Sequence, residues 1–260
     1  MSAVLKSKSS GSVRDRVSRE EWQMRVDLAA AYQLAALYKW TDLIYTHFSA
    51  RVPGTHDFLI NPYGYLFDEV TASNLVRITP DAKIVDDPLG AGYNEAGFVI
   101  HGCVHEARPE VNCVIHTHTR AGVAVSAQKD GLLPISQHAA RVYGEVTYHD
   151  YEGIALDMDE RTRLARDLGP TSRVMILRNH GLLTMGDTVR EAFDLMYYLD
   201  CACQSQIDAL SAGRDGIVKM SEQAAITAGK QFNRPGREAP KRDWPALLRL
   251  LERKGIDYIG

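Results

Sequence analysis

The stretch Val114-Ile115-His116-Thr117-His118-Thr119 joins a short β-branched apolar run to two histidines. Such a run is typical of a strand that is buried on both faces of a sheet. Because side chains alternate along an extended chain, His116 and His118 project from the same face. Two imidazoles at this spacing can chelate a metal. Ordinary polar histidines at the end of a strand are the competing interpretation.

A third histidine follows another buried apolar run, Val174–Leu177, in the segment Arg178-Asn179-His180-Gly181. In α/β folds such loop residues gather at the ends of the sheet. Three imidazoles suit a borderline metal such as zinc and leave a fourth position for water or substrate. Glu95 begins the helix predicted before the His116 strand. It either caps that helix or serves as a fourth ligand or general base.

Periodicity predicts strands interleaved with helices. Ser18-Arg19-Glu20-Glu21 is a capping box before an amphipathic helix, and Thr188 begins a second capping box before a long helix that ends near Gly213. Alternation from Ile44 to Val52, a Pro53-Gly54 turn and a further extended run to Ile60 predict a hairpin. Shorter strands are predicted at residues 75–78 and 83–85, and a helix at Glu95–Arg108. The fold class is therefore α/β rather than a helical bundle.

The predicted helix at Glu95–Arg108 also carries His101 and His105, one helical turn apart. This spacing can bind metal, but no third ligand is near in the sequence. We expect both side chains to pack and form hydrogen bonds.

Composition narrows the class of partner. The chain has 260 residues, of which 45% are hydrophobic and 24% charged, with a formal net charge of −3. These values exclude overall disorder and a fibrous repeat, and they give no strong field for nucleic acid or membrane. No apolar stretch approaches the roughly 20 residues that span a bilayer. The N-terminal residues lack the apolar segment of a secretory signal, and four cysteines without CxxC spacing favour a reducing compartment. We expect a cytoplasmic protein with a small-molecule ligand.

The sequence predicts one domain with an extension at each end. The expected boundaries are a flexible tail at 1–17, the domain at 18–213 and a basic extension at 214–260. From Lys230 to Lys254 there are eight Lys or Arg and three Asp or Glu. Trp244-Pro245 and the leucines after it predict a short docking helix. Packing on its own or a neighbouring subunit is the expected role, with binding to nucleic acid or an anionic surface as the alternative.

Several ordered motifs resemble the class II aldolase/adducin family, from about Val26 to about Leu210. They are closer to the adducin head and its bacterial relatives than to the sugar-phosphate aldolases. The segments that carry the resemblance are Asn94–Phe98 with His101, Ala107–Val111, Cys113–Thr119, Gly131–Ser136, Tyr148–Tyr151 and Leu177–Leu182.

The resemblance implies a three-layer α/β/α fold with a mainly antiparallel central sheet, and a C4 homotetramer with active sites at subunit interfaces. The family's zinc triad corresponds to His116, His118 and His180 in this chain. The acid/base glutamate of its fuculose phosphate aldolases corresponds to Glu95. One Zn²⁺ per chain is expected, with Mn²⁺, Co²⁺ and Fe²⁺ as alternatives.

The chain departs from the aldolases where they bind the phosphate of the substrate. His47, Tyr63-Gly64 and Tyr93-Asn94 stand in place of a Gly-Asn, a Ser-Gly and a Ser-Ser pair. Small donors that can surround a phosphate have become large rings. We therefore expect these residues to line a pocket for an unphosphorylated substrate, although core or surface packing would also explain the three aromatic rings.

The proton donor is less well determined. A tyrosine that a neighbouring subunit contributes in the aldolases corresponds to a position near His138, where an imidazole could donate the proton. A solvated loop histidine is an equal alternative at this position. Tyr143, Tyr148 and His149 are the other candidates for the proton donor.

The leading functional hypothesis is a metal-dependent carbon–carbon lyase. It would act by aldol cleavage or decarboxylation on a small unphosphorylated hydroxy-carbonyl or carboxylate substrate, with Glu95 moving the proton. A dehydratase or an iron-dependent oxygenase could use the same three histidines. A non-catalytic, adducin-like interaction protein is the alternative from another class. A scaffold, however, has no physical need for four convergent residues of this kind.

Overall fold

The computed structural model describes residues 11–153, 158–234 and 239–260. An eight-stranded sheet of order β4-β3-β2-β1-β5-β8-β7-β6 forms the centre of the molecule. Its strands are β1 (His47–Arg51), β2 (Phe58–Ile60), β3 (Val76–Ile78), β4 (Ile84–Asp86), β5 (Cys113–Thr117), β6 (Val146–His149), β7 (Val174–Leu177) and β8 (Gly181–Gly186). Among the described strands, β6 and β7 alone pair in parallel. The predicted α/β class and mainly antiparallel sheet are therefore confirmed.

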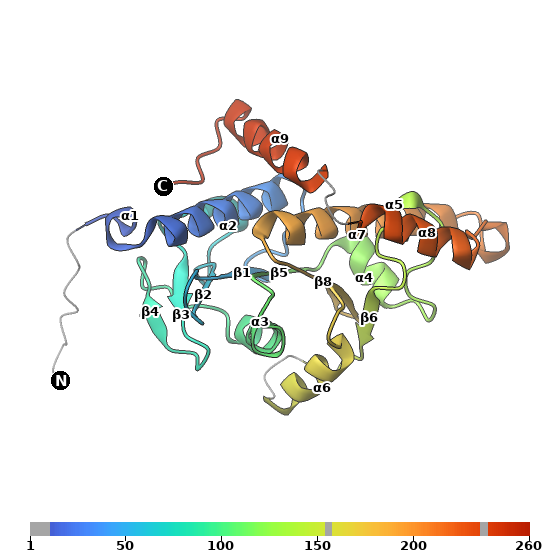
Figure 1. Ribbon diagram of the computed structural model, residues 1–260, viewed down its shortest axis with the longest axis horizontal. Helices are drawn as coiled ribbons and strands as arrows, with labels where there is room; N and C mark the ends of the chain where they lie inside the picture. Colours follow the sequence, from blue (N-terminus) through green and yellow to red (C-terminus); the bar gives the residue numbers. More distant parts are fainter. Residues whose placement is uncertain (1–10, 154–157, 235–238) are drawn as a thin grey trace.

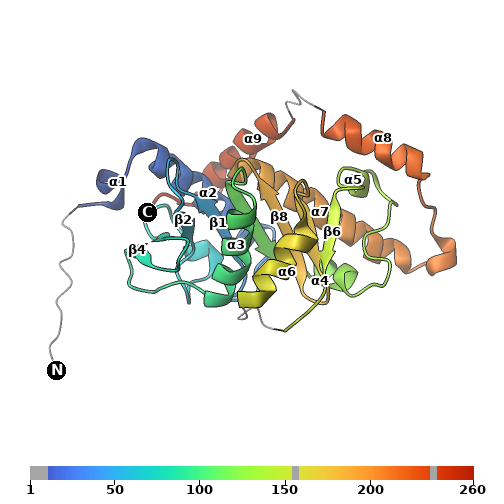
Figure 2. The same ribbon diagram turned by 60° about the horizontal axis from the view of Figure 1, so that its bottom comes forward.

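Helices cover the sheet on both faces. Helices α2 (Arg19–Leu37) and α7 (Val189–Leu210) lie on one face, and α3 (Glu95–Ala107) and α6 (Met158–Leu168) lie on the other (Figure 1). Figure 2 shows α3 and α6 side by side on the near face. The remaining helices are α1 (Val13–Arg16), α4 (Arg120–Ser126), α5 (Gln137–Ala140), α8 (Glu222–Phe232) and α9 (Ala239–Arg253), with 3₁₀ turns at Phe67–Glu69 and Arg214–Gly216.

Alternate residues of the central strands enter two different cores. On β7, Val174 and Ile176 join the core under α2 and α7, whereas Met175 and Leu177 join the core under α3 and α6. Every residue of this strand is buried. The continuous apolar run follows directly, because a strand covered on both faces needs apolar side chains at every position.

Capping and turn motifs in the sequence correctly predicted two helices and a hairpin. Ser18 caps α2 by accepting a hydrogen bond from the Glu21 amide, and Thr188 caps α7 in the same way through Glu191. The predicted hairpin is confirmed as β1 and β2, which pair antiparallel. Strand β1 also pairs antiparallel with β5, and His47 lies opposite His116 in that pair. The carboxyl end of β5 therefore lies beside the first residue of β1.

The two chain extensions contact the domain. The prediction that residues 1–17 form a flexible tail is wrong from Val13 onward. Val13 is buried, and Arg16 of α1 forms an ion pair with Asp86. Residues 1–10 lie outside the described residues. At the other end, α9 begins at Ala239, before the predicted start at Trp244, and packs on α2 and α7 of its own chain. Its contacts come from side chains such as Leu251, which is fully buried.

Candidate metal centre

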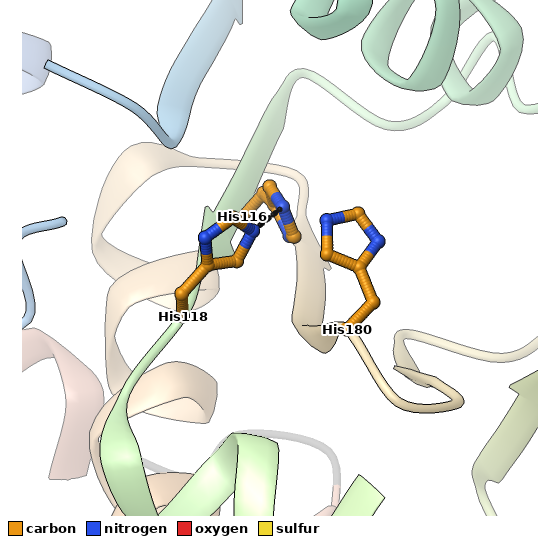
Figure 3. A group of neighbouring side chains, drawn as sticks. All are labelled: His116, His118 and His180. Atoms are coloured by element: carbon orange, nitrogen blue, oxygen red, sulfur yellow. Dashed lines mark hydrogen bonds between the residues drawn. The ribbon is translucent and has the colours of Figure 1, made fainter. Parts of the chain in front are cut away.

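The fold brings the three predicted histidines together. His116 lies near the end of β5, His118 follows that strand, and His180 lies in the turn between β7 and β8 (Figure 3). One ring nitrogen of each lies within 4.8 Å of the others. Two segments about 60 residues apart in sequence thus converge because β5 and β8 are neighbours in the sheet.

Hydrogen bonds orient two of these rings. His116 donates its Nδ1 proton to the Leu182 carbonyl at 3.0 Å, since a carbonyl can only accept. The Nδ1 atom of His118 lies 2.8 Å from a carboxylate oxygen of Asp42. A neutral imidazole that donates from Nδ1 presents a bare Nε2, and the two Nε2 atoms lie 2.9 Å apart, joined by the dashed line in Figure 3. Metal-binding histidines are oriented by partners of this kind.

This donor set fits a divalent metal. Two facing nitrogen lone pairs repel unless a proton or a cation lies between them. Two ligands on tetrahedral zinc, at about 2.0–2.1 Å from the ion, would be roughly 3.3 Å apart, close to the spacing found here. Burial lowers the pKa of His116 well below its ordinary value, and burial together with His118 lowers the pKa of His180 to about 4. Both imidazoles are therefore neutral at physiological pH, as ligation requires.

The three histidines open onto a cavity of about 650 Å³. That volume is in the range of sites for small ligands. Four of the residues predicted to line a substrate pocket line this cavity, namely His47, Tyr63, Tyr93 and Asn94. Glu95, the predicted acid/base, lines it too. Gly64, also predicted to line the pocket, is not among the described residues that do so. It has a left-handed backbone conformation with φ of 86°.

Glu95 is the first residue of α3 and is exposed at the cavity. The preceding residue, Asn94, caps the helix by accepting from the Ala96 amide, so the helix does not depend on Glu95 for its cap. The Tyr93 hydroxyl donates to the Ala82 carbonyl at 2.9 Å, and burial with the nearby Glu95 charge raises the Tyr93 pKa. Tyr93 is thus anchored as a wall of the cavity.

The structure does not bring His138 to the cavity of its own chain. This residue lies on α5, with its ring centroid 5.6 Å from that of Tyr198 on α7. The other proton-donor candidates also have partners elsewhere: the Tyr148 hydroxyl accepts from the Leu132 amide, and His149 lies 2.8 Å from Asp167. Tyr143 is likewise outside the residues that line the cavity, within the part of the chain that is described. A role for His138 across a subunit interface remains a prediction.

Among the residues of the site that were not assigned from the sequence, Asp42, Thr46 and Tyr151 have a visible role. Asp42 holds His118, and Tyr151 places its ring 6.3 Å from that of His180. Thr46 lines the cavity with φ of 66°, and its buried hydroxyl has no hydrogen-bond partner among the described residues. A strained β-branched residue of this kind is a frequent mark of a functional site. Tyr151 stands within a family motif, whereas Asp42 carries no local signal.

Replacing Asp42 with asparagine should weaken zinc binding by about 10–100-fold, because the carboxylate that orients His118 is lost. Competition with a chromophoric chelator would measure the affinity. Asp187→Asn is the matched control, since Asp187 pairs with Arg173. Equal affinities of Asp42→Asn and wild type would show that His118 needs no such support.

Replacing Gly181 with alanine should weaken zinc binding and stability without removing a ligand. A Cβ atom there would lie 2.4 Å from the Thr117 carbonyl oxygen and 3.0 Å from the His118 ring. The start of β8, and His180 with it, would have to move, at a cost of about 1–3 kcal/mol. Thermal unfolding and zinc titration check both effects. Gly216→Ala, where the nearest atom is 3.4 Å away, should change neither.

The chain is similar to known proteins over most of its length. Residues 26–207 match the family model described as Class II Aldolase and Adducin N-terminal domain. A crystal structure of an aldolase II superfamily protein from Pseudomonas syringae is similar with a TM-score of 0.92 and 57% identity, covering 95% of this chain and 99% of that one.

Two further relatives carry different functional names. L-fuculose 1-phosphate aldolase from Glaciozyma antarctica PI12 has a TM-score of 0.80 and 27% identity, covering 93% of each chain. Alpha-adducin of Rattus norvegicus is 41% identical over 94% of this chain, which spans 35% of that protein. The family model and the Pseudomonas syringae structure together cover the whole site, and the chain therefore belongs to the class II aldolase and adducin family.

Proposed function

We propose that the chain is a metal-dependent carbon–carbon lyase of the aldehyde-lyase or carboxy-lyase type. One observation carries the proposal: three imidazole nitrogens converge at the wall of a cavity that also exposes the carboxylate of Glu95. A family that includes a solved fuculose phosphate aldolase supports the reaction class.

His116, His118 and His180 would hold the metal. Three nitrogen ligands suit Zn²⁺, and Mn²⁺, Co²⁺ or Fe²⁺ would be accepted by the same donors. When bound, a divalent metal supplies a Lewis acid that stabilises negative charge on the substrate oxygens beside the broken carbon–carbon bond. Leu182 and Asp42 keep two ligand rings in position through their hydrogen bonds.

Glu95 would move the proton. Its carboxylate is exposed at the cavity, and the cap of α3 is supplied by Asn94, so the side chain is free to approach a substrate. His138 of a neighbouring subunit would be a second proton-transfer group. This assignment goes together with a cytoplasmic homotetramer that has active sites at its interfaces, which we propose from the family resemblance. No helix in the described part of the chain is both long and apolar enough to cross a membrane.

The cavity favours an unphosphorylated hydroxy-carbonyl or carboxylate substrate. Within the described residues, its lining holds aromatic rings but no lysine or arginine. A phosphate dianion would need cationic or clustered backbone donors to offset its desolvation. The rings of Tyr63 and Tyr93 instead supply apolar surface beside a few polar groups.

A panel of α-hydroxy ketones and hydroxy acids would test the reaction, with zinc- and manganese-loaded protein and detection of released aldehyde or carbon dioxide. Turnover that is lost in His116→Ala would support the lyase. Absence of turnover with both metals, together with protein that takes up no metal, would favour an adducin-like interaction role, to which the similarity with alpha-adducin points. Oxygen consumption by iron-loaded protein would instead indicate an oxygenase.

A further inference from the structure

Four buried side chains form a continuous hydrogen-bonded chain that ends at the cavity. His105 Nδ1 lies 3.3 Å from the Val111 carbonyl oxygen, and His105 Nε2 lies 2.8 Å from Ser49 Oγ. Ser49 Oγ is in turn 2.6 Å from His101 Nδ1, and His101 Nε2 is 2.8 Å from His47 Nδ1. All four side chains are buried, and His47 lines the cavity.

The Val111 carbonyl, at one end of this series of hydrogen bonds, determines which atom carries each proton in it. A carbonyl only accepts, so His105 donates from Nδ1 and its Nε2 must accept from the Ser49 hydroxyl. Ser49 has a single proton, and its oxygen therefore accepts from His101 Nδ1. The bare Nε2 of His101 accepts from His47 Nδ1. With this order of protons, every donor and acceptor between the Val111 carbonyl and His47 Nδ1 is satisfied. His47 keeps an unprotonated Nε2.

We infer that Ser49, His101 and His105 hold His47 in the tautomer that presents a hydrogen-bond acceptor to the cavity. His47 thereby selects a hydroxyl as the substrate group beside its Nε2 and disfavours an ionised phosphate or carboxylate group at that one position. This inference rests on the proposed function, because it names the substrate group that the same cavity takes. Ser49, His101 and His105 act as positioning residues, and His47 determines specificity.

The hydrogen-bonded series orients His47 and does not conduct protons. It ends at the Val111 carbonyl, which has no proton to donate. Burial lowers the pKa of His105 to about 3, with a further contribution from Arg51, and burial with the neighbouring histidines lowers the pKa of His101 well below its ordinary value. The rings therefore stay neutral, and only a neutral chain is restricted to this single order of protons.

The absence of a side chain at Gly97 on α3 leaves room for the His47 ring, because a Cβ atom there would lie 2.6 Å from His47 Cδ2 and 2.9 Å from its Nε2. The His47 ring is centred 5.2 Å from that of His116. A hydroxyl of a substrate bound beside His116 would thus find an acceptor at His47.

Nitrogen-15 NMR of protein labelled at histidine tests the proton order without any substrate. We expect His47 to carry its proton on Nδ1 and to leave Nε2 bare. Ser49→Ala removes the acceptor of His101 Nδ1–H, so His101 can turn its proton to Nε2 and His47 then gains a proton on its own Nε2. Ser205→Ala is the matched control, because the Ser205 hydroxyl donates to the Cys201 carbonyl on α7. A proton on His47 Nε2 in the wild type would overturn the inference.

Two hydroxamates test the selectivity on zinc-loaded protein. Both chelate zinc, but glycolohydroxamate carries a hydroxyl where acetohydroxamate carries a hydrogen. We expect wild type to bind glycolohydroxamate about tenfold more tightly, the size of one good neutral hydrogen bond. The preference should disappear in His47→Phe and shrink in Ser49→Ala, with zinc content unchanged.

The two experiments separate failure of this inference from failure of the proposed function. Equal wild-type affinities for the two hydroxamates would overturn the acceptor role while leaving the metal centre intact. Failure of the protein to take up zinc, and with it failure of both compounds to bind, would overturn the metal centre as well, whatever proton order the NMR spectra show.

Discussion

Replacing Glu95 with glutamine is expected to lower turnover by about 10²–10⁴-fold while the metal stays bound. Glutamine keeps the size and polarity of the side chain but cannot accept a proton at neutral pH. The change should leave α3 intact, because Asn94 supplies the helix cap. The kcat for the substrate found by screening, together with metal content, measures the effect.

Glu106→Gln is the matched control for this variant. Glu106 lies on the same helix, pairs with Arg161 and is outside the residues that line the cavity. The same substitution there should leave kcat unchanged. Full turnover in Glu95→Gln would remove this carboxylate from the mechanism and leave His138 or a group of the substrate to move the proton.

Replacing His180 with alanine is expected to weaken metal binding more than any change in a supporting residue. The variant loses one of three ligands, whereas Asp42→Asn only loosens one, at a cost of about 10–100-fold. Since His180 lies in a turn and is partly exposed, its loss should leave the sheet intact. Titration of metal-free protein with zinc, followed by competition with a chelator, measures the difference.

His56→Ala serves as the control for this second variant, because His56 is exposed in the turn between β1 and β2 and does not line the cavity. Its zinc affinity should equal that of the wild type. If His180→Ala binds zinc as tightly as the wild type, the ion would have to be held by other residues, and the triad would lose its assigned role.

The sequence predicted those features that depend on short segments. The cap at Ser18 and the β-branched run at Val174–Leu177 each act within a few residues, and the structure has α2 and β7 in these places. The spacing of His116 and His118 is also local, so their common face follows from strand geometry alone. The packing and hydrogen-bonding role expected of His101 and His105 is confirmed by their bonds to Ser49.

Tertiary structure determines the rest of the site. Asp42 reaches His118 across 76 positions of sequence, and a lone aspartate in a loop has no pattern that indicates such a partner. The His47 chain likewise needs β1 and α3 to be packed together before Ser49 meets His101. The start of α9 was missed because Pro245 suggested a first turn, whereas the helix begins at Ala239.

Anomalous diffraction at the zinc edge, from crystals of protein purified without a chelating tag, would locate the metal. We predict one peak per chain, at about 2.0–2.1 Å from a ring nitrogen of each of His116, His118 and His180. The same peak should be absent in His180→Ala crystals grown in parallel. A wild-type map with no peak at these nitrogens, even after soaking in zinc, would contradict the metal centre and the lyase mechanism built on it.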